Sequence, residues 1–508
     1  MDIHRLIEEL ACVKRAIIYG QSKNVLPEAG LHKEYERSAE NLFHYLVLRS
    51  FDLRPIQHAL SQFGLSALGT AEGYVLQNLR NVIQHLKRMA GTLIVAKLGQ
   101  ESLGYEESRD LLDKHTKNLF GLLPSGAKTK IMVTLPTEAA FDETSILNMA
   151  KNGMDVVRIN LSHDDEQVWR AMVRNVQTVS RMIERPIKIY MDLAGPKIRT
   201  GSISYQNSKG KERNKLRIRE GEHVFLTKER GKTIKSKFTK DGEQIQMAKI
   251  NVSLPQIIDD VSIGDPILFD DGMVTGTIVT KNENSCEVKI EKCFKPKLGS
   301  EKGINLPQTQ LNLPALTPED IQVLSFACEH ADILGYSFVR NEHDVELLYK
   351  ELEVLGAKDI GVVFKIENQE AFENFPSILL KGMKRNKIGV MIARGDLAVE
   401  LGFERISEVQ KELLWICEAA HIPVIWATQV LETLAKKGIP TRAEISDAAQ
   451  GASAECVMLN KGPHINDAIH TLRTILDKMD GLMSKKKESL RALNIAKNYM
   501  EWESEEIG

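Results

Sequence analysis

The sequence lacks long apolar segments. No stretch approaches the roughly 18 uninterrupted apolar residues of a membrane-spanning helix, so no membrane span is predicted. The first ten residues, MDIHRLIEEL, carry acidic side chains and no long apolar segment, unlike a secretory signal. These absences predict a soluble, cytoplasmic protein with no membrane partner.

The sequence also has almost no net charge: it contains 67 basic and 69 acidic residues, which gives a net charge of −2. We therefore expect no nucleic-acid partner and leave small-molecule chemistry open. The six cysteines show no CxxC spacing, which gives no sign of a metal knot. We expect them to be buried thiols in a reducing compartment. They are Cys12, Cys286, Cys293, Cys328, Cys417 and Cys456.

Glycine-rich phosphate loops are the third absence. The sequence contains neither GxxxxGK[ST] nor a convincing GxGxxG. Any nucleotide would therefore have to be held by a metal ion, by cationic side chains and by a further domain.

Eight short apolar runs dominate the chain from Lys130 onward, each followed by a segment of helical periodicity. This alternation predicts a parallel α/β fold, and eight is the number of strands that closes a parallel barrel. With 508 residues the chain is too long for one compact core, so we expect two or three domains. The runs are 131–135, 156–159, 187–191, 333–338, 361–364, 388–392, 423–426 and 456–459.

Two other sequence patterns accompany the barrel. Residues 1–122 place apolar side chains at three- and four-residue spacings, as in 38–51 and 73–89, and predict a helical N-terminal domain with a linker at 122–126. Residues 201–305 alternate apolar and polar positions between glycine turns, which predicts a small β-barrel domain inserted as a lid. The (β/α)8 TIM barrel of the α/β class would comprise 127–200 and 306–480, with a C-terminal helix and acidic tail over 481–508.

Polar side chains stand at or just after the ends of most apolar runs. Because barrel active sites are built at the C-terminal ends of the strands, we expect these side chains to meet at one mouth. This convergence is the strongest physical indication of function in the sequence. The residues are Thr134, Asn160, Asp192, Lys365, Asp396 and Thr428.

Carboxylates and cations are mixed among the candidates. Glu367 lies two residues after Lys365, so alternation places both on one side of an extended segment. Glu367 and Asp396 could hold a hard divalent cation through oxygen, and the forks of Arg158 and Arg199 suit phosphate. Each of these residues alone is also typical of a solvated surface. Together they indicate metal-assisted phosphoryl transfer.

The candidates stand in a series of nine motifs that, from Thr129 to Met479, strongly resembles the pyruvate kinase family. The order of the motifs along the chain is that of the family. They are 129–131 (TKI), 158–163 (RINLSH), 191–201 (MDLAGPKIRTG), 269–272 (FDDG), 302–307 (KGINLP), 365–368 (KIEN), 393–397 (ARGDL), 427–432 (ATQVLE) and 440–444 (PTRAE).

The resemblance implies transfer of a phosphoryl group from phosphoenolpyruvate to ADP with Mg2+ or Mn2+. In that reading Glu367 and Asp396 bind the metal, and Lys365 and Arg158 hold the phosphoryl group. Ala393, Gly395 and Asp396 form the pocket for the substrate carboxylate, and Thr428 lies beside the enolate carbon. Arg199, Lys302 and Asp271 face the nucleotide phosphates, and His163, which by itself could equally be a structural histidine, lies near the nucleoside.

Departures from the family pattern alter these expectations. Potassium-dependent members bind the ion through the equivalents of Asn160, Ser162 and Asp192, with a threonine and a glutamate where this chain has Leu193 and Lys197. A lysine ammonium can supply the charge of the missing ion, so we expect activity without K+. The loops 134–137 and 459–462 also differ, which leaves the nucleotide side and the substrate range open.

The two ends of the chain differ from ordinary members as well. Only about 30 residues follow the barrel, too few for the family's C-terminal effector domain, so activation through that domain is not expected. The N-terminal helices have no counterpart that can be aligned. Two alternatives stay open: a metal-dependent oxo-acid lyase, and a non-catalytic sensor or scaffold that binds a partner through these helices. The oligomeric state, including a homo-oligomer, is also open.

Overall fold

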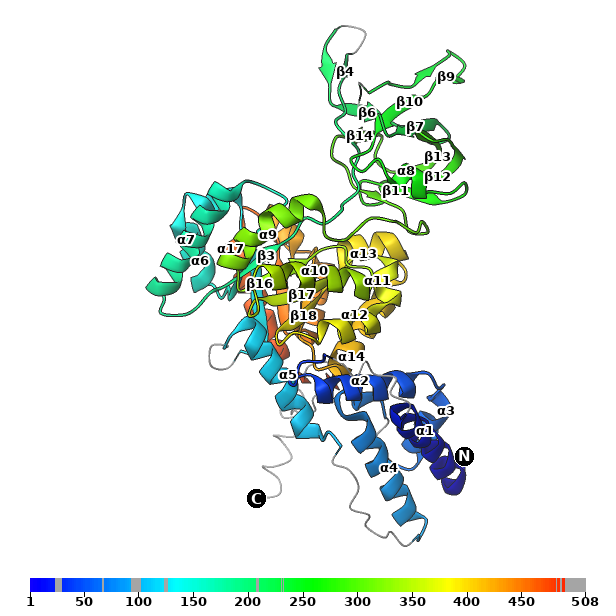
Figure 1. Ribbon diagram of the computed structural model, residues 1–508, viewed down its shortest axis with the longest axis vertical. Coiled ribbons are helices and arrows are strands. Elements are labelled where there is room, and N and C mark those ends of the chain that lie inside the picture. Colours follow the sequence, from blue (N-terminus) through cyan, green and yellow to red (C-terminus); the bar gives the residue numbers. More distant parts are fainter. Residues whose placement is uncertain are drawn as a thin grey trace, which may run out of the picture.

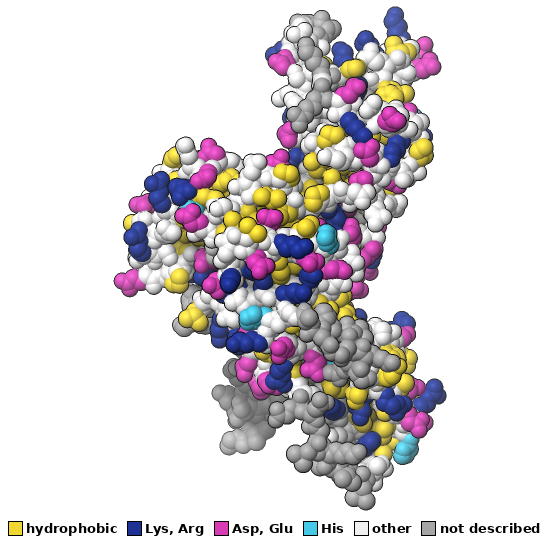
Figure 2. Space-filling view, viewed as in Figure 1, with side chains coloured by type: hydrophobic (Ala, Val, Ile, Leu, Met, Phe, Trp, Pro, Cys, Tyr) yellow, Lys and Arg dark blue, Asp and Glu magenta, His cyan; other side chains and the backbone are white. Residues whose placement is uncertain are grey.

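The computed structural model describes residues 1–22, 30–65, 68–92, 102–122, 127–206, 210–229, 231, 233–480, 482–484 and 487–488. The molecule is elongated, with helices at one end, a barrel in the middle and a β-rich insert at the other end (Figure 1). On the face drawn in Figure 2, basic and acidic side chains are interspersed among the described residues.

A closed barrel of eight parallel strands forms the centre. The ring closes where Lys130–Val133 pairs with Cys456–Leu459. Every predicted apolar run is one of its strands, so the predicted α/β fold class is confirmed. The strands in ring order are β1 (Lys130–Thr134), β2 (Val156–Asn160), β3 (Lys188–Asp192), β16 (Ile333–Tyr336), β17 (Gly361–Ile366), β18 (Ile388–Ala393), β19 (Val424–Ala427) and β20 (Cys456–Leu459).

Helices connect the strands around the outside of the barrel (Figure 1). Several begin at a residue whose side chain caps the first turn: Asp165 accepts from the N–H groups of Gln167 and Val168, and Thr317 accepts from that of Asp320. The helices are α6 (Glu143–Lys151), α7 (Glu166–Met182), α9 (Pro318–His330), α10 (Glu342–Val354), α11 (Gln369–Glu373), α12 (Phe375–Gly382), α13 (Arg394–Leu401), α14 (Ile406–Ala419), α15 (Glu432–Lys437), α16 (Arg442–Gln450) and α17 (Ile465–Met479), with short 3-10 turns at Thr137–Ala140 and Gly451–Ser453.

Side chains that point into the barrel form a buried apolar cluster of their own, separate from the core between strands and helices. Because side chains alternate along a strand, the next inward position toward the C-terminal end of several strands carries a polar residue. Val156 is thus followed by Arg158, Tyr190 by Asp192 and Val363 by Lys365. This interior cluster comprises Met132, Val156, Tyr190, Ile333, Val363, Met391, Ile425, Ala427, Cys456 and Met458, together with Leu119 and Phe120 from outside the barrel.

The N-terminal helices pack against the N-terminal end of the barrel, opposite the mouth (Figure 1). Buried hydrogen bonds join the two parts, because the Asn41 amide donates to the Ala419 carbonyl at 2.8 Å and the His421 ring lies 3.0 Å from Ser38 Oγ. Residues of both parts also share one apolar core. The elements are α1 (Ile3–Ser22), α2 (Glu36–Arg49), α3 (Arg54–Gln62), α4 (Val75–Met89) and α5 (Tyr105–Phe120), with 3-10 turns at Leu68–Thr70 and Glu72–Tyr74.

The β insert projects from the barrel mouth and has its own apolar core (Figure 1). Its main sheet has six strands and is open between its outer strands in the described residues. The order is β10 (Ala248–Asn251), β7 (His223–Thr227), β13 (Ser285–Cys293), β12 (Val274–Lys281), β11 (Pro266–Phe269) and β15 (Ile304–Asn305). Shorter pairs are β4 (Tyr205–Gln206) with β5 (Glu212–Arg213), β6 (Lys215–Arg217) with β14 (Lys297–Gly299), and β8 (Lys237–Phe238) with β9 (Gln244–Gln246), and the helix α8 spans Ile257–Asp260.

Some expectations from the sequence were wrong. Cys12 is exposed and Cys293 and Cys328 are half-buried, so only three of the six thiols lie in the core as expected. After the barrel, Met483–Ser484 (β21) pairs with Lys487–Glu488 (β22). Most of the segment for which a C-terminal helix and acidic tail are predicted lies outside the described residues, as does 123–126 of the predicted linker. Within the described chain, no helix has the length and apolarity to cross a membrane. The exact domain boundaries stay predictions.

Candidate active site

A cavity of about 710 Å³ opens at the C-terminal ends of the barrel strands, on the side of the β insert. Most of the predicted site residues line it, although they come from all parts of the barrel sequence. Gly395, Lys302 and Asp271 are the predicted residues outside its lining. The predicted residues that line the cavity are Arg158, Asn160, Ser162, His163, Asp192, Lys197, Arg199, Lys365, Glu367, Ala393, Asp396 and Thr428.

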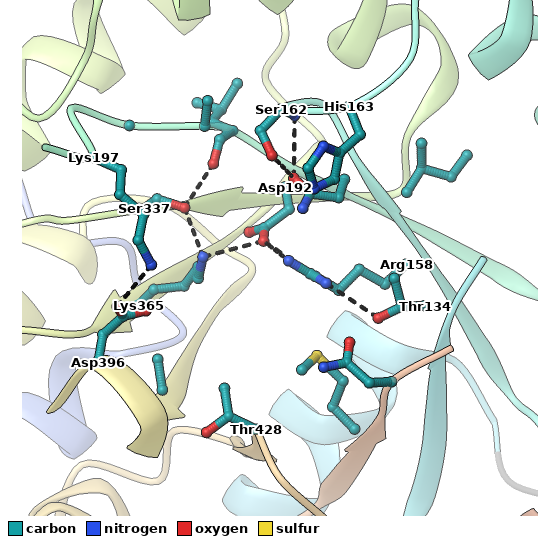
Figure 3. A pocket seen from close by; sticks show the side chains of 18 of the residues that line it. Thr134, Arg158, Ser162, His163, Asp192, Lys197, Ser337, Lys365, Asp396 and Thr428 are labelled. Atoms are coloured by element: carbon teal, nitrogen blue, oxygen red, sulfur yellow. Dashed lines mark hydrogen bonds and ion pairs between the residues drawn. The ribbon is translucent and has the colours of Figure 1, made fainter. Parts of the chain in front are cut away.

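Asp192 lies in the cavity and binds several of the side chains around it (Figure 3). Its Oδ2 accepts from Arg158 Nε at 3.1 Å and from Lys365 Nζ at 3.1 Å, and its Oδ1 accepts from the Tyr190 hydroxyl at 3.1 Å. Burial alone would raise the pKa of the Asp192 carboxyl, but the two cations outweigh it and hold that pKa below the ordinary value. Asp192 is therefore a buried anion that fixes two cations side by side.

Lys365 is held by three groups. Its ammonium also donates to Ser337 Oγ at 2.7 Å and lies 3.2 Å from Glu367 Oε1. Burial would lower the pKa of Lys365, but Asp192 and Glu367 raise it, so the side chain stays charged. Lys365 and Glu367 thus share one side of their segment, as strand alternation predicts.

Ser337 is a residue that the sequence reasoning missed. It follows β16 at the end of the predicted apolar run 333–338, and its hydroxyl donates to the Leu193 carbonyl at 2.6 Å. The only available signal was its place directly after a strand. The next residue, Phe338, has a left-handed φ of 55°, which turns its N–H toward Glu367 Oε2 at 2.7 Å.

Glu367 and Asp396 form a pair of carboxylates that face the same cavity. Burial raises the pKa of Glu367, Lys365 opposes this, and Asp396 and Asp192 raise it further. The described residues contain no group of three or more His, Cys, Asp and Glu side chains placed for a metal. Two carboxylates that face one cavity nevertheless fit a hard divalent cation whose other ligands are water and substrate oxygens.

Lys197 takes a different partner from the expected one. Its ammonium lies 2.8 Å from Asp396 Oδ1, whereas Asp192 is neutralised by Arg158 and Lys365 (Figure 3). At the expected monovalent-ion site, Asn160 Oδ1 accepts from Ser162 N at 3.1 Å and from Ser162 Oγ at 2.8 Å. Two positive charges of the protein therefore already stand beside Asp192.

Thr428 lies at a strained turn after β19. Its φ is 66°, which is unfavourable for a β-branched residue, and its hydroxyl accepts from the Gly395 N–H at 2.7 Å. Arg394 holds the turn by donating to the Thr428 carbonyl at 2.6 Å while its guanidinium lies 4.4 Å from the Trp426 ring centroid and pairs with Asp447. Sequence reasoning missed Arg394 and Asp447, although Arg394 stands inside the ARGDL motif.

The expected nucleotide side is only partly assembled. His163 and Arg199 line the cavity, and burial with the nearby Lys461 and Arg199 charges lowers the pKa of His163. Lys302 lies in the insert, and its ammonium pairs with Asp270 Oδ1 at 2.9 Å. Lys295 binds the other oxygen of Asp270 at 2.7 Å.

The fold and the site define a class: a (β/α)8 barrel whose mouth holds a buried cation pair next to two carboxylates. The family model described as pyruvate kinase, barrel domain, matches residues 126–463. A pyruvate kinase of Bacillus licheniformis is 32% identical over 369 residues, which cover 71% of this chain and 58% of that protein. The chain belongs to the pyruvate kinase family.

Distant relatives give the same result. A pyruvate kinase of Thermococcus litoralis is 36% identical over 344 residues, covering 67% of this chain and 66% of that protein. One of Dictyostelium discoideum is 32% identical over 338 residues, covering 66% and 62%. The match spans about three fifths of the length of the bacterial relatives.

Proposed function

We propose that this chain transfers the phosphoryl group of phosphoenolpyruvate to ADP in the cytoplasm, giving pyruvate and ATP. The observation that carries the proposal is the buried cation pair: Arg158 and Lys365 share Asp192, in the same cavity as Glu367 and Asp396. Phosphoryl transfer needs cations that neutralise the phosphoryl oxygens, carboxylates that hold a metal, and fixed geometry, and this cavity supplies all three.

Arg158 and Lys365 would bind the transferring phosphoryl group. Burial would lower the pKa of Arg158, but Asp192 raises it, so the guanidinium is charged at neutral pH. Because Asp192 anchors both cations before substrate arrives, little reorganisation accompanies binding. Lys365 would also stabilise the enolate oxygen that develops as the phosphoryl group leaves.

The substrate carboxylate would bind at the N-terminal end of α13. The N–H groups of the first turn, at Gly395 and Asp396, would donate to the carboxylate there. The Gly395 N–H now donates to Thr428 Oγ1, so a carboxylate that took this N–H would release the Thr428 hydroxyl. The freed hydroxyl would then be available on the side where the enolate carbon is protonated.

Glu367 and Asp396 would hold Mg2+ or Mn2+. The bound ion would supply Lewis-acid stabilisation of the phosphoryl and enolate oxygens. The Lys197 ammonium would leave Asp396 or share it, since it now lies 2.8 Å from one carboxylate oxygen. Glu367 would be ionised in that state, because the metal charge offsets the burial that raises its pKa.

ADP would bind between His163 and Arg199 on the barrel and Lys302 on the insert. Lys302 and Asp271 do not line the cavity, so this proposal includes a movement of the insert toward the mouth. We also propose that K+ is not required. The support is that Arg158, Lys365 and the Tyr190 hydroxyl already satisfy Asp192. Lys197, paired with Asp396, adds a further cation to the same cavity.

Pyruvate formation from phosphoenolpyruvate and ADP, with Mg2+ present, tests the proposal. Glu367→Gln should lower turnover at least about 100-fold and weaken Mn2+ binding measured by electron paramagnetic resonance. Glu373→Gln, on the exposed face of α11, is the matched control and should leave both unchanged. Wild-type chain that forms no pyruvate under any metal condition would refute the kinase. Pyruvate release from a dicarboxylic 2-oxo acid, with Mg2+ and without phosphoenolpyruvate or ADP, would favour an oxo-acid lyase.

A further inference from the structure

The end of helix α5 closes the N-terminal end of the barrel interior. Its last two residues, Leu119 and Phe120, are 2% and 1% exposed and belong to the interior cluster rather than to the core of the N-terminal helices. The chain after them stays at the same end of the barrel, since the Leu122 carbonyl accepts from the Lys130 ammonium at 2.5 Å. Helix α5 therefore plugs the N-terminal end of the barrel.

Two glycines make room for this plug. A Cβ added at Gly361 in β17 or at Gly389 in β18 would lie 2.6 Å from a methyl carbon of Leu119. No side chain fits at that distance, so any other residue at either position would displace Leu119. The barrel interior is thus shaped around a residue of the N-terminal part.

Tyr190 connects the interior cluster to the active site. Its ring is fully buried in the same cluster as Phe120, and its hydroxyl donates to Asp192 at 3.1 Å. Burial and the Asp192 carboxylate raise the pKa of Tyr190 well above its ordinary value, so the hydroxyl keeps its proton. The absence of a side chain at Gly335 leaves the space in which the hydroxyl and the carboxylate meet.

We propose that Tyr190 is a positioning residue for phosphoryl transfer and that helix α5 holds it in place. Phe120 and Leu119 close the N-terminal end of the interior cluster. The cluster fixes the position of the Tyr190 ring along the barrel axis, and the Tyr190 hydroxyl orients the Asp192 carboxylate. Asp192 in turn fixes Arg158 and Lys365. The N-terminal helices are therefore part of the support of the active site. The kinetic part of this inference rests on the proposed function.

A double-mutant cycle on the full chain tests the inference. Tyr190→Phe removes only the hydroxyl and should lower kcat about tenfold while the KM for ADP stays within about twofold, because the cations are misplaced and the nucleotide residues are not. Phe120→Leu should lower kcat about threefold. The kcat of the double variant should be no lower than that of Tyr190→Phe alone, because Phe120→Leu acts through the hydroxyl that Tyr190→Phe has already removed.

The control is Leu86→Ala in α4, which is buried among the N-terminal helices and outside the interior cluster. It should lower the melting temperature and leave kcat unchanged. A Tyr190→Phe variant with wild-type kcat would overturn the inference. A double variant whose loss of kcat equals the product of the losses in Tyr190→Phe and Phe120→Leu would also overturn it. A drop in kcat for Leu86→Ala as large as that for Phe120→Leu would also count against it.

Two further readouts separate this inference from the proposed function. Phosphoenolpyruvate binding in the presence of Mn2+ and the absence of ADP, measured by calorimetry, needs no turnover and should weaken in Tyr190→Phe. If the wild-type chain neither binds nor converts phosphoenolpyruvate, the proposed function fails. The same cycle on urea unfolding then decides the inference: non-additive losses for Phe120 and Tyr190 support it, and additive losses overturn it.

Discussion

A size swap between Leu119 and Gly361 would show whether the N-terminal helices and the barrel form one packed unit. Leu119 fills space that Gly361 leaves free, with an added Cβ at Gly361 lying 2.6 Å from Leu119 Cδ1. The next nearest atoms to that Cβ, on Asp332 and Ile333, lie at 3.5 and 3.7 Å, which is ordinary contact. The clash at Gly361 is therefore with Leu119 alone.

The expected magnitudes follow from packing. Leu119→Ala should lower the free energy of unfolding by about 3 kcal/mol, because a leucine that is 2% exposed leaves a cavity behind. Gly361→Ala should cost about 1–2 kcal/mol by overpacking against Leu119. In the double variant the new methyl group enters the vacated space, so we expect it to be at least about 1 kcal/mol more stable than the sum of the single effects predicts.

Urea unfolding followed by tryptophan fluorescence and circular dichroism measures these values. Trp426 is fully buried in β19 and reports on the barrel. Gly389→Ala is a weaker partner for the swap, because its added Cβ would also lie 3.3 Å from the Pro423 carbonyl and from Val363. Strictly additive losses at Leu119 and Gly361 would refute the packing of α5 inside the barrel.

Three other outcomes are expected. Lys365→Met should abolish pyruvate formation, by about 1,000-fold or more, and should leave far-UV circular dichroism unchanged at pH 7; a variant with a tenth of wild-type turnover would contradict the role of the ammonium. Wild-type turnover should be the same in K+ and in tetramethylammonium salts of equal ionic strength, and a strict requirement for K+ would overturn the charge argument at Asp192. Burial raises the pKa of Glu222 in the insert from 4.5 to about 7, so the protonated form is favoured by folding. The insert should therefore be most stable below pH 4.5 and lose up to about 3 kcal/mol between pH 4.5 and 7, and Glu222→Gln should remove this slope in hydrogen exchange of β7 and β13.

The barrel was predictable because each strand is a short apolar run followed by a helix, a pattern that few folds share. The gathering of Arg158, Asp192 and Lys365 was predictable for a related reason. Each stands near the C-terminal end of its strand, and all such ends meet at one mouth. The spacing of apolar runs therefore predicted the barrel, and the position of polar residues at the ends of those runs predicted which side chains meet at its mouth.

The choice of partners within the site was not predictable. Asp270 and Asp271 both have left-handed φ angles, 52° and 57°, so strand alternation says nothing about which of them faces Lys302. Lys197 follows a glycine with φ 66° and a proline, and the turn carries its ammonium to Asp396. Such contacts depend on backbone geometry that residue spacing does not encode.

The plug formed by α5 could not be found from the sequence at all. Leu119 and Phe120 look like the apolar end of an amphipathic helix, and the glycines that make room for Leu119 lie more than 200 residues further along the chain. The apparent domain boundary near residue 122 therefore divides side chains that pack in a single cluster. A chain cut there would expose the interior of the barrel beneath Tyr190 and leave the Lys130 ammonium without the Leu122 carbonyl. Loss of activity in such a truncation would report on packing, so the part played by the N-terminal helices has to be read from single substitutions in the full chain.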